Sequence, residues 1–323
     1  MNRMLLLSLA VLLAAPELTA QEGGRRRGGG RRRERDVGSV TLDHVRYQRV
    51  EFEAASLRSG TSHCGVYLPP GYDDPGNAER SYPWIVWLHG MSEDDRDFHF
   101  GGAKVLDEML GSGALPPLVF VAAAAPSRTL YANGEAEGNV ADLIVKDLLA
   151  HVETAFRVLK EREGRAVMGI SLGGMAALRF AFTDPARFGT VATHSAAVFP
   201  EDPAELPAQH AATVERFGDR LGWNSILGDP IDEERYRAIN PTCLAHELKK
   251  AGAPRIYFDA GTSDRYGFGP ANQHLSEVLT ESGVPHTFRL IEGGEHSWSG
   301  GTVQLALKES LKFVGEGFAD DDR

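Results

Sequence analysis

A serine stands between two glycines in the run Gly-Ile-Ser-Leu-Gly at positions 169–173. The apolar residues 166–170 predict a short strand before it, and residues 172–182 predict a helix after it. This context is typical of a nucleophile elbow, a tight turn that projects a serine oxygen above the end of a sheet. Small neighbours are needed there because larger side chains would clash. The pattern predicts Ser171 as a nucleophile, with a glycine-rich turn of no chemical importance as the alternative.

A serine alcohol becomes an effective nucleophile only when a base takes its proton. His296 is the predicted base, because it lies in a glycine-containing loop after the predicted strand 286–291. Asp264 is the predicted acid that orients this imidazole, because it lies beyond the end of the predicted strand 255–260. The order serine, aspartate, histidine along the chain is that of the α/β-hydrolases.

Other acids and histidines compete for these two roles. Asp259 lies inside a predicted strand, so we expect it to be structural, whereas Glu292 and Glu295 share the histidine's own loop and are weaker rivals. His274 falls on a predicted helix and His286 opens a strand. The loop of Asp264 can bend toward the histidine loop, so reach favours Asp264 as the partner of His296, while the other histidines remain competitors.

The oxyanion formed during acyl transfer needs two hydrogen-bond donors. One is predicted to be the backbone N–H of Leu172, directly after the nucleophile. The other is predicted to be the N–H of Met91, which follows the buried strand 84–88 in the run His-Gly-Met. We also assign His89 and Gly90 to the substrate pocket, since Gly90 permits a close approach. An ordinary turn is the alternative.

Two further side chains are assigned to the substrate pocket. His194 follows the predicted strand 188–193, the next strand after the elbow, and a structural role is its alternative. Trp298 lies two residues after the predicted base. Neither assignment involves a metal, because no residues have the spacing of a zinc site.

Strands alternate with helices along most of the chain, which predicts a mainly parallel sheet with helices on both faces. This is the α/β-hydrolase fold, expected over residues 37–323, and two antiparallel strands at 45–54 and 63–68 open it. Residues 196–241 interrupt the alternation and are predicted to form a cap that shapes the pocket. The remaining predicted elements are strands at 84–88, 118–123, 166–170, 188–193, 255–260 and 286–291, and helices at 140–156, 172–182, 271–282 and 303–314.

The first 36 residues differ from the rest of the chain. Residues 1–20 combine a charged start, an apolar run too short to span a bilayer and small residues at the end, which predicts a secretory signal peptide and a secreted or periplasmic protein. Residues 21–36 are rich in Arg and Gly with nothing apolar to bury, which predicts a disordered linker. The formal net charge is −11 even with this basic segment, which argues against nucleic-acid binding by the folded part.

With these residues assigned, the chain resembles an esterase family of α/β-hydrolases that includes feruloyl esterases, acetylxylan esterases, enterochelin esterases and mycolyltransferases. The resemblance runs from about residue 63 to residue 313. The matching runs are Val-Tyr-Leu-Pro-Pro-Gly-Tyr at 66–72, Trp-Leu-His-Gly at 87–90, Gly-Ile-Ser-Leu-Gly-Gly at 169–174, Asp-Ala-Gly-Thr-Ser-Asp at 259–264 and Gly-Glu-His-Ser-Trp at 294–298.

The resemblance implies a carboxylic ester hydrolase that needs no cofactor and uses the triad Ser171, Asp264 and His296. Family members often have a glycine-rich stretch after His-Gly, whereas this chain has Met-Ser-Glu-Asp-Asp-Arg-Asp at 91–97, so the substrate preference is not carried over. We expect a small-molecule or polysaccharide-linked ester, such as an acetyl or feruloyl ester. An acyltransferase with the same triad and a non-catalytic binding protein on a hydrolase scaffold are the alternatives. A disulfide between Cys64 and Cys243 stays open.

Overall fold

The computed structural model describes residues 37–296 and 302–319. The predicted signal peptide (1–20), the predicted linker (21–36) and Trp298 therefore lie outside the described residues. Within the described part of the chain, no helix is both long and apolar enough to cross a membrane.

An eight-stranded sheet forms the centre of this part, in the order β1-β2-β4-β3-β7-β8-β9-β10. β2 is antiparallel to both neighbours, whereas every pair from β4 to β10 is parallel. The sheet is therefore mainly parallel, as predicted, and the parallel strands end along one edge. The strands are β1 (Arg46–Glu53), β2 (Thr61–Leu68), β3 (Trp84–Leu88), β4 (Val119–Ala123), β7 (Arg165–Ile170), β8 (Thr190–His194), β9 (Arg255–Gly261) and β10 (Thr287–Ile291). A separate short hairpin consists of β5 (Asn133–Gly134) and β6 (Gly138–Asn139).

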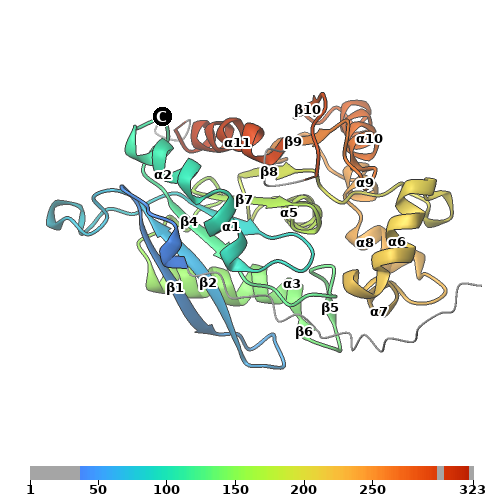
Figure 1. Cartoon of the computed structure of the whole chain (residues 1–323), viewed down its shortest axis with the longest axis horizontal. Helices are drawn as coiled ribbons and strands as arrows, with labels where there is room; N and C mark the ends of the chain where they lie inside the picture. The colour runs from blue at the N-terminus through green and yellow to red at the C-terminus, as the bar shows by residue number, and fades with distance from the viewer. Residues whose placement is uncertain (1–36, 297–301, 320–323) are drawn as a thin grey trace, which may run out of the picture. The chain divides into compact units, whose positions relative to one another are not determined.

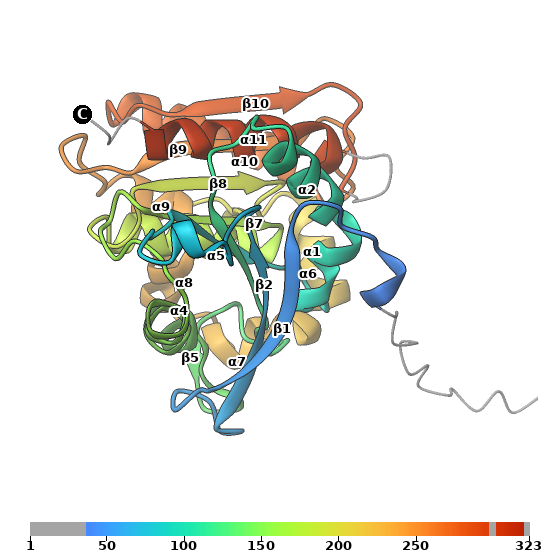
Figure 2. The same ribbon diagram turned by 90° about the vertical axis from the view of Figure 1, so that its left-hand side faces the viewer.

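Helices cover both faces of the sheet (Figures 1 and 2). One face carries α1 (Asp95–Gly101), α2 (Ala103–Gly111) and α11 (Thr302–Ala319). The other face carries α3 (Val140–Asp142), α4 (Leu149–Ala155), α5 (Leu172–Thr183) and α10 (Phe268–Glu281). A π-helical segment, Leu143–Leu148, joins α3 to α4, so the predicted helix 140–156 is continuous.

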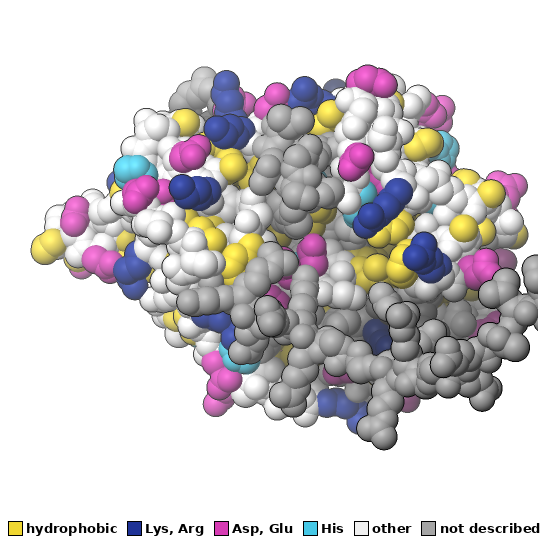
Figure 3. Space-filling model, in the orientation of Figure 1, with side chains coloured by type: hydrophobic (Ala, Val, Ile, Leu, Met, Phe, Trp, Pro, Cys, Tyr) yellow, Lys and Arg dark blue, Asp and Glu magenta, His cyan; other side chains and the backbone are white. Residues whose placement is uncertain are grey.

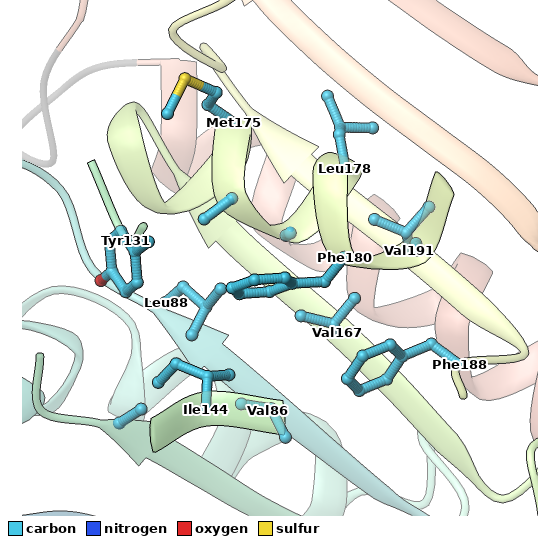
Figure 4. Close-up of a cluster of buried hydrophobic side chains, with 14 of the residues drawn as sticks. Val86, Leu88, Tyr131, Ile144, Val167, Met175, Leu178, Phe180, Phe188 and Val191 are labelled. Carbon is cyan, nitrogen blue, oxygen red and sulfur yellow. The ribbon is translucent and has the colours of Figure 1, made fainter. Parts of the chain in front are cut away.

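Two apolar layers separate the sheet from these helices, because alternate residues of a strand face opposite sides. Val86 and Leu88 of β3 pack with Phe180 of α5 in one layer (Figure 4). Ile85 and Trp87, from the same strand, belong to the other layer. Burial on both faces explains why these strands are continuous apolar runs in the sequence.

The segment predicted as a cap folds into short helices between β8 and β9, and Figure 1 shows them beyond one end of the sheet. They are α6 (Ala208–Leu221), α7 (Trp223–Leu227) and α8 (Glu233–Ile239); α9 (Pro241–Ala245) starts at the last residue of the predicted segment. Single 3-10 turns complete the described structure at Val37–Ser39, Pro75–Asn77 and Pro203–Glu205.

Most elements start and end within a few residues of their predicted positions. β8 is a consequential exception: it extends to His194, so this residue ends a buried strand instead of starting a loop. α1 and α2 were not predicted, because both are short.

Both cysteines are free thiols, Cys64 buried in β2 and Cys243 half-buried in α9. Nowhere in the described ranges do three or more His, Cys, Asp or Glu side chains form a group that could hold a metal ion.

Candidate active site

Ser171 occupies the turn between β7 and α5, with φ 57° and ψ −120°. Its N–H donates to the carbonyl oxygen of His194 at 3.0 Å. Two glycines make this turn sterically feasible. A Cβ on Gly169 would lie 2.4 Å from the oxygen of Gly173, and one on Gly173 would lie 2.1 Å from the oxygen of Leu88. The sequence pattern therefore corresponds to a real packing requirement.

Asp264 and His296 form a hydrogen bond in which Nδ1 donates to Oδ2 at 2.8 Å. The acid lies in the turn after β9 and its side chain is 1% exposed; the histidine follows β10 and its side chain is 10% exposed. The other carboxylate oxygen accepts the N–H of Tyr266 at 2.9 Å. Because Nδ1 carries the hydrogen, Nε2 is left with a lone pair that can accept a proton.

Close contact between the two loops brings this acid to this base. The N–H of Ser263 donates to the oxygen of Gly294 at 2.9 Å, and the N–H of Thr262 donates to the oxygen of Ile291 at 3.0 Å. A Cβ on Gly261 would lie 2.0 Å from the oxygen of Gly294. Glycine at position 261 therefore permits the approach.

Two aromatic rings hold the imidazole of His296. The ring of Tyr266 meets it edge-on, with centroids 4.8 Å apart, and the ring of Phe268 lies 5.7 Å away. With Asp264, these contacts fix the orientation of the imidazole beside the cavity that Ser171 also lines.

The predicted oxyanion donors flank the nucleophile. Leu172 is the first residue of α5, so its N–H has no acceptor within the helix. Met91 and Gly90 line the same cavity, and a Cβ on Gly90 would lie 3.5 Å from the Cβ of Ser171. The carboxylate of Glu93 accepts the N–H of Gly90 at 2.8 Å.

His89 does not line this cavity, which corrects the prediction of a pocket role. Its side chain is buried, with Nδ1 donating to the oxygen of Gly90 at 2.8 Å and Nε2 accepting the N–H of Ala125 at 3.1 Å. Both ring nitrogens are thus engaged in shaping the backbone. His89 supports the loop and does not face a ligand.

His194 is also outside the cavity, and here the structural alternative is the correct one. It is fully buried, with Nδ1 2.8 Å from Asp259 and Nε2 3.0 Å from the hydroxyl of Ser310. This buried cluster joins β8, β9 and α11. Asp259 therefore pairs with His194, as a structural residue, while Asp264 reaches His296.

The cavity beside Ser171 has a volume of about 190 Å³ and an opening to solvent. The other residues that line this cavity were not predicted from the sequence. Two of them, Glu93 and Arg265, carry charge, and the sequence indicates them only weakly because both lie in polar loops. In the view of Figure 3, hydrophobic side chains gather next to basic ones to the right of the centre. The full lining consists of Gly90, Met91, Glu93, Ile170, Ser171, Leu172, Ala197, Phe199, Thr213, Phe217, Leu221, Arg265, Tyr266, Phe268 and His296.

Comparisons with known proteins agree with this architecture. The model of the family described as "Putative esterase" matches residues 58–311. An esterase of Mycobacterium tuberculosis is 28% identical over 274 residues, which cover 77% of this chain and 55% of the relative, so the chain spans just over half of that protein's length.

Solved structures show the same fold. A ferulic acid esterase superposes with a TM-score of 0.68 at 23% identity, covering 85% of this chain and 99% of its own. An S-formylglutathione hydrolase from Agrobacterium tumefaciens superposes with a TM-score of 0.66 at 17% identity, covering 86% and 98%. The predicted α/β-hydrolase fold is confirmed, and the chain belongs to the family described as "Putative esterase".

Proposed function

We propose that this protein hydrolyses carboxylic esters through an acyl-enzyme formed on Ser171. The observation that carries the proposal is the 2.8 Å hydrogen bond between Asp264 and His296 at the wall of the cavity that contains Ser171. The proposed nucleophile and the proposed base then line one space that can hold a substrate, and the buried acid orients the base.

In this mechanism the Ser171 hydroxyl attacks the ester carbonyl carbon while Nε2 of His296 takes its proton. The Met91 and Leu172 N–H groups donate to the oxyanion of the tetrahedral intermediate. The intermediate collapses as the C–O bond to the alcohol breaks and His296 returns the proton to the leaving oxygen. Water then repeats the sequence on the acyl-enzyme and releases the acid.

The lining of the cavity supports an ester with an apolar acyl group. Phe199, Phe217, Tyr266 and Phe268 present aromatic side chains near the nucleophile. A planar acyl group, such as a hydroxycinnamoyl group carried on a carbohydrate, suits these walls better than a charged one. The fold similarity to a ferulic acid esterase is consistent with a hydroxycinnamoyl ester. Acetyl esters are the smaller candidate substrates.

An acyltransferase is the second candidate, because an alcohol could replace water in attacking the acyl-enzyme. The opening of the cavity to solvent gives either acceptor access. Product partition between free acid and transesterified sugar, measured at increasing acceptor concentration, distinguishes the two. A non-catalytic binding role is disfavoured by the complete set of catalytic groups.

The predicted signal at residues 1–20 supports export, so the proposed place of action is the periplasm or the exterior. Its support is the charged start and the short apolar run of residues 5–15. Amino-terminal sequencing of protein from the cell exterior is expected to start near Gln21. Recovery of intact Met1 from the cytoplasm would contradict export.

The decisive experiment is a panel of p-nitrophenyl acetate and methyl hydroxycinnamates with the purified protein, with Ser171→Ala as the matched control. We expect the variant to fold and its kcat to fall at least about 10³-fold, since only the oxyanion donors and the substrate-binding contacts remain. A fluorophosphonate should label the wild type and not the variant. Equal turnover by a folded Ser171→Ala protein would refute the proposal.

A further inference from the structure

Three non-glycine residues adopt left-handed backbone conformations in the loop that leads from β4 to β5. The φ angles are 66° at Arg128, 49° at Leu130 and 54° at Tyr131. A side chain at such a position crowds its own backbone, so this conformation persists only where the surroundings hold it. Three cases within four residues require an explanation in the contacts of this loop.

Arg179 of α5 holds the loop from one side. Its guanidinium donates to the oxygen of Tyr131 at 2.6 Å and to the oxygen of Leu130 at 3.4 Å. In the part of the chain that the structure describes, it forms no ion pair with a carboxylate. Burial lowers the pKa of Arg179 to about 10, which still leaves it cationic at neutral pH. The hydrogen bonds of this buried cation therefore go to two backbone carbonyl oxygens.

The cap holds the loop from a second side. The N–H of Leu130 donates to the oxygen of Leu221, at the end of α6, at 3.2 Å. The neighbouring Gly222 packs so closely that a Cβ there would lie 1.9 Å from the oxygen of Arg128. The loop is therefore held between the helix that follows the nucleophile and the helix that forms a wall of the cavity.

Tyr131 extends from this loop to the segment that carries the predicted oxyanion donor. Its hydroxyl donates to the oxygen of His89 at 2.9 Å, and its side chain lies near Leu88 at the end of β3 (Figure 4). Burial raises the pKa of Tyr131, so the hydroxyl keeps its proton. The carbonyl it fixes is two residues before Met91.

We propose that Tyr131, held by Arg179, is a positioning residue that fixes the loop 89–91 so that the Met91 N–H meets the oxyanion. This inference rests on the proposed function. The helix α5 then positions both proposed oxyanion donors. Leu172 is its first residue, and Met91 is positioned through Arg179 and Tyr131. Oxyanion donors act only within about 3 Å of the oxygen, so a small displacement of the loop lowers kcat and leaves substrate binding intact.

The test compares Tyr131→Phe with Tyr82→Phe. Both tyrosines are buried, but the Tyr82 hydroxyl has no hydrogen-bond partner among the described residues and lies before β3, at the far end of the strand. We expect Tyr131→Phe to lower kcat and the affinity for phenylboronic acid, a tetrahedral adduct former, by about tenfold each, with KM changed less than about twofold. Tyr82→Phe should leave all three values near those of the wild type.

Hydrogen exchange of the backbone amides in residues 89–93 tests the same inference without any substrate. Exchange should be faster in Tyr131→Phe than in the wild type and Tyr82→Phe. If no ester is hydrolysed by the wild type, the proposed function fails while this measurement still decides the role of Tyr131. Unchanged exchange, or unchanged kcat and boronate affinity in an active and folded Tyr131→Phe protein, overturns the inference.

Discussion

At the scale of single residues, two aspartates five positions apart contact different histidines. Asp264 accepts Nδ1–H of His296 at the cavity, and Asp259 lies 2.8 Å from His194 in the interior. Their side chains are almost equally buried, so burial alone does not identify the catalytic acid. The partner histidines differ in position, and this difference supports Asp264 as the proposed acid.

Replacing each aspartate by asparagine should therefore produce different defects. Asp264→Asn should lower kcat by roughly 10⁴-fold with the fold retained, because the asparagine N–H would favour the wrong tautomer of His296. Asp259→Asn should keep most of kcat and lower the free energy of unfolding by about 2 kcal/mol, because a buried hydrogen bond is disturbed. Steady-state kinetics and urea unfolding measure the two effects. Near-normal kcat in a folded Asp264→Asn protein would show that the acid is misassigned.

A second residue-scale prediction concerns charge selection by Arg265. Its guanidinium lies over the ring of Tyr266 and donates to the phenolic oxygen at 3.0 Å. Glu93, the other charged residue of the lining, is oriented by the Gly90 N–H. Neutral apolar acyl groups remain the best match for the aromatic walls, and an exposed arginine should lessen the discrimination against an acyl group that ends in a carboxylate.

We expect Arg265→Glu to lower kcat/KM for a p-nitrophenyl glutarate half-ester by about fivefold relative to neutral p-nitrophenyl valerate. Arg265→Lys should preserve the ratio of kcat/KM for the half-ester to kcat/KM for the valerate. Added salt should weaken the contribution of the arginine charge to this ratio in the wild type. The measurement is the ratio of the two kcat/KM values at low and high ionic strength. An unchanged ratio in Arg265→Glu would remove Arg265 from substrate selection.

At the scale of elements, the helix α6, from the segment predicted as a cap, forms a wall of the cavity. Its residues Thr213, Phe217 and Leu221 line the cavity. Near its start, His210 is buried, with Nε2 3.1 Å from the oxygen of Gly267, and packs on Phe199. A buried histidine therefore links this helix to the residue before α10.

Burial lowers the pKa of His210 from its ordinary value of 6.5. The unfolded chain then binds the proton more readily, so the stability that His210 contributes is complete above pH 6.5 and is lost as the pH falls below it. We expect the Tm of the wild type to fall more between pH 7.5 and pH 5 than that of His210→Gln, which can still donate to Gly267. Thermal melts of both proteins test this. Parallel pH profiles would exclude His210 as a source of acid sensitivity.

At the scale of the whole molecule, the chain divides into residues 1–36 and the unit 37–323. The linker sequence 21–36 has no apolar side chain to bury. Deleting it should leave kcat and KM on p-nitrophenyl acetate within about twofold, because it has nothing to add to a packed core. Kinetics of the protein that begins at Val37, beside the one that begins at Gln21, provide the test. A large loss of kcat in the shorter protein would place the linker in the site.

The sequence by itself determined most of the strands and the tight turn that holds Ser171, the proposed nucleophile. Buried parallel strands read as apolar runs, and the elbow needs glycines at fixed positions, so both leave local signals. β3, β7 and α5 were predicted almost to the residue for this reason. The order of Ser171, Asp264 and His296, the proposed triad, was equally readable, because each residue follows a predicted strand.

Only the tertiary structure decided which side chains meet. The strand order places β9 beside β10, and the contact of Gly261 with Gly294 joins their loops, which pairs Asp264 with His296. His194 was misassigned because the strand ends one residue later than predicted, which turns a loop side chain into a buried one. The cavity walls come from α6 and from loops distant in sequence. The hydrogen bonds from Arg179 to Tyr131 and from Tyr131 to His89 join α5 to two loops. Such contacts depend on the packing of whole elements, which no local pattern records.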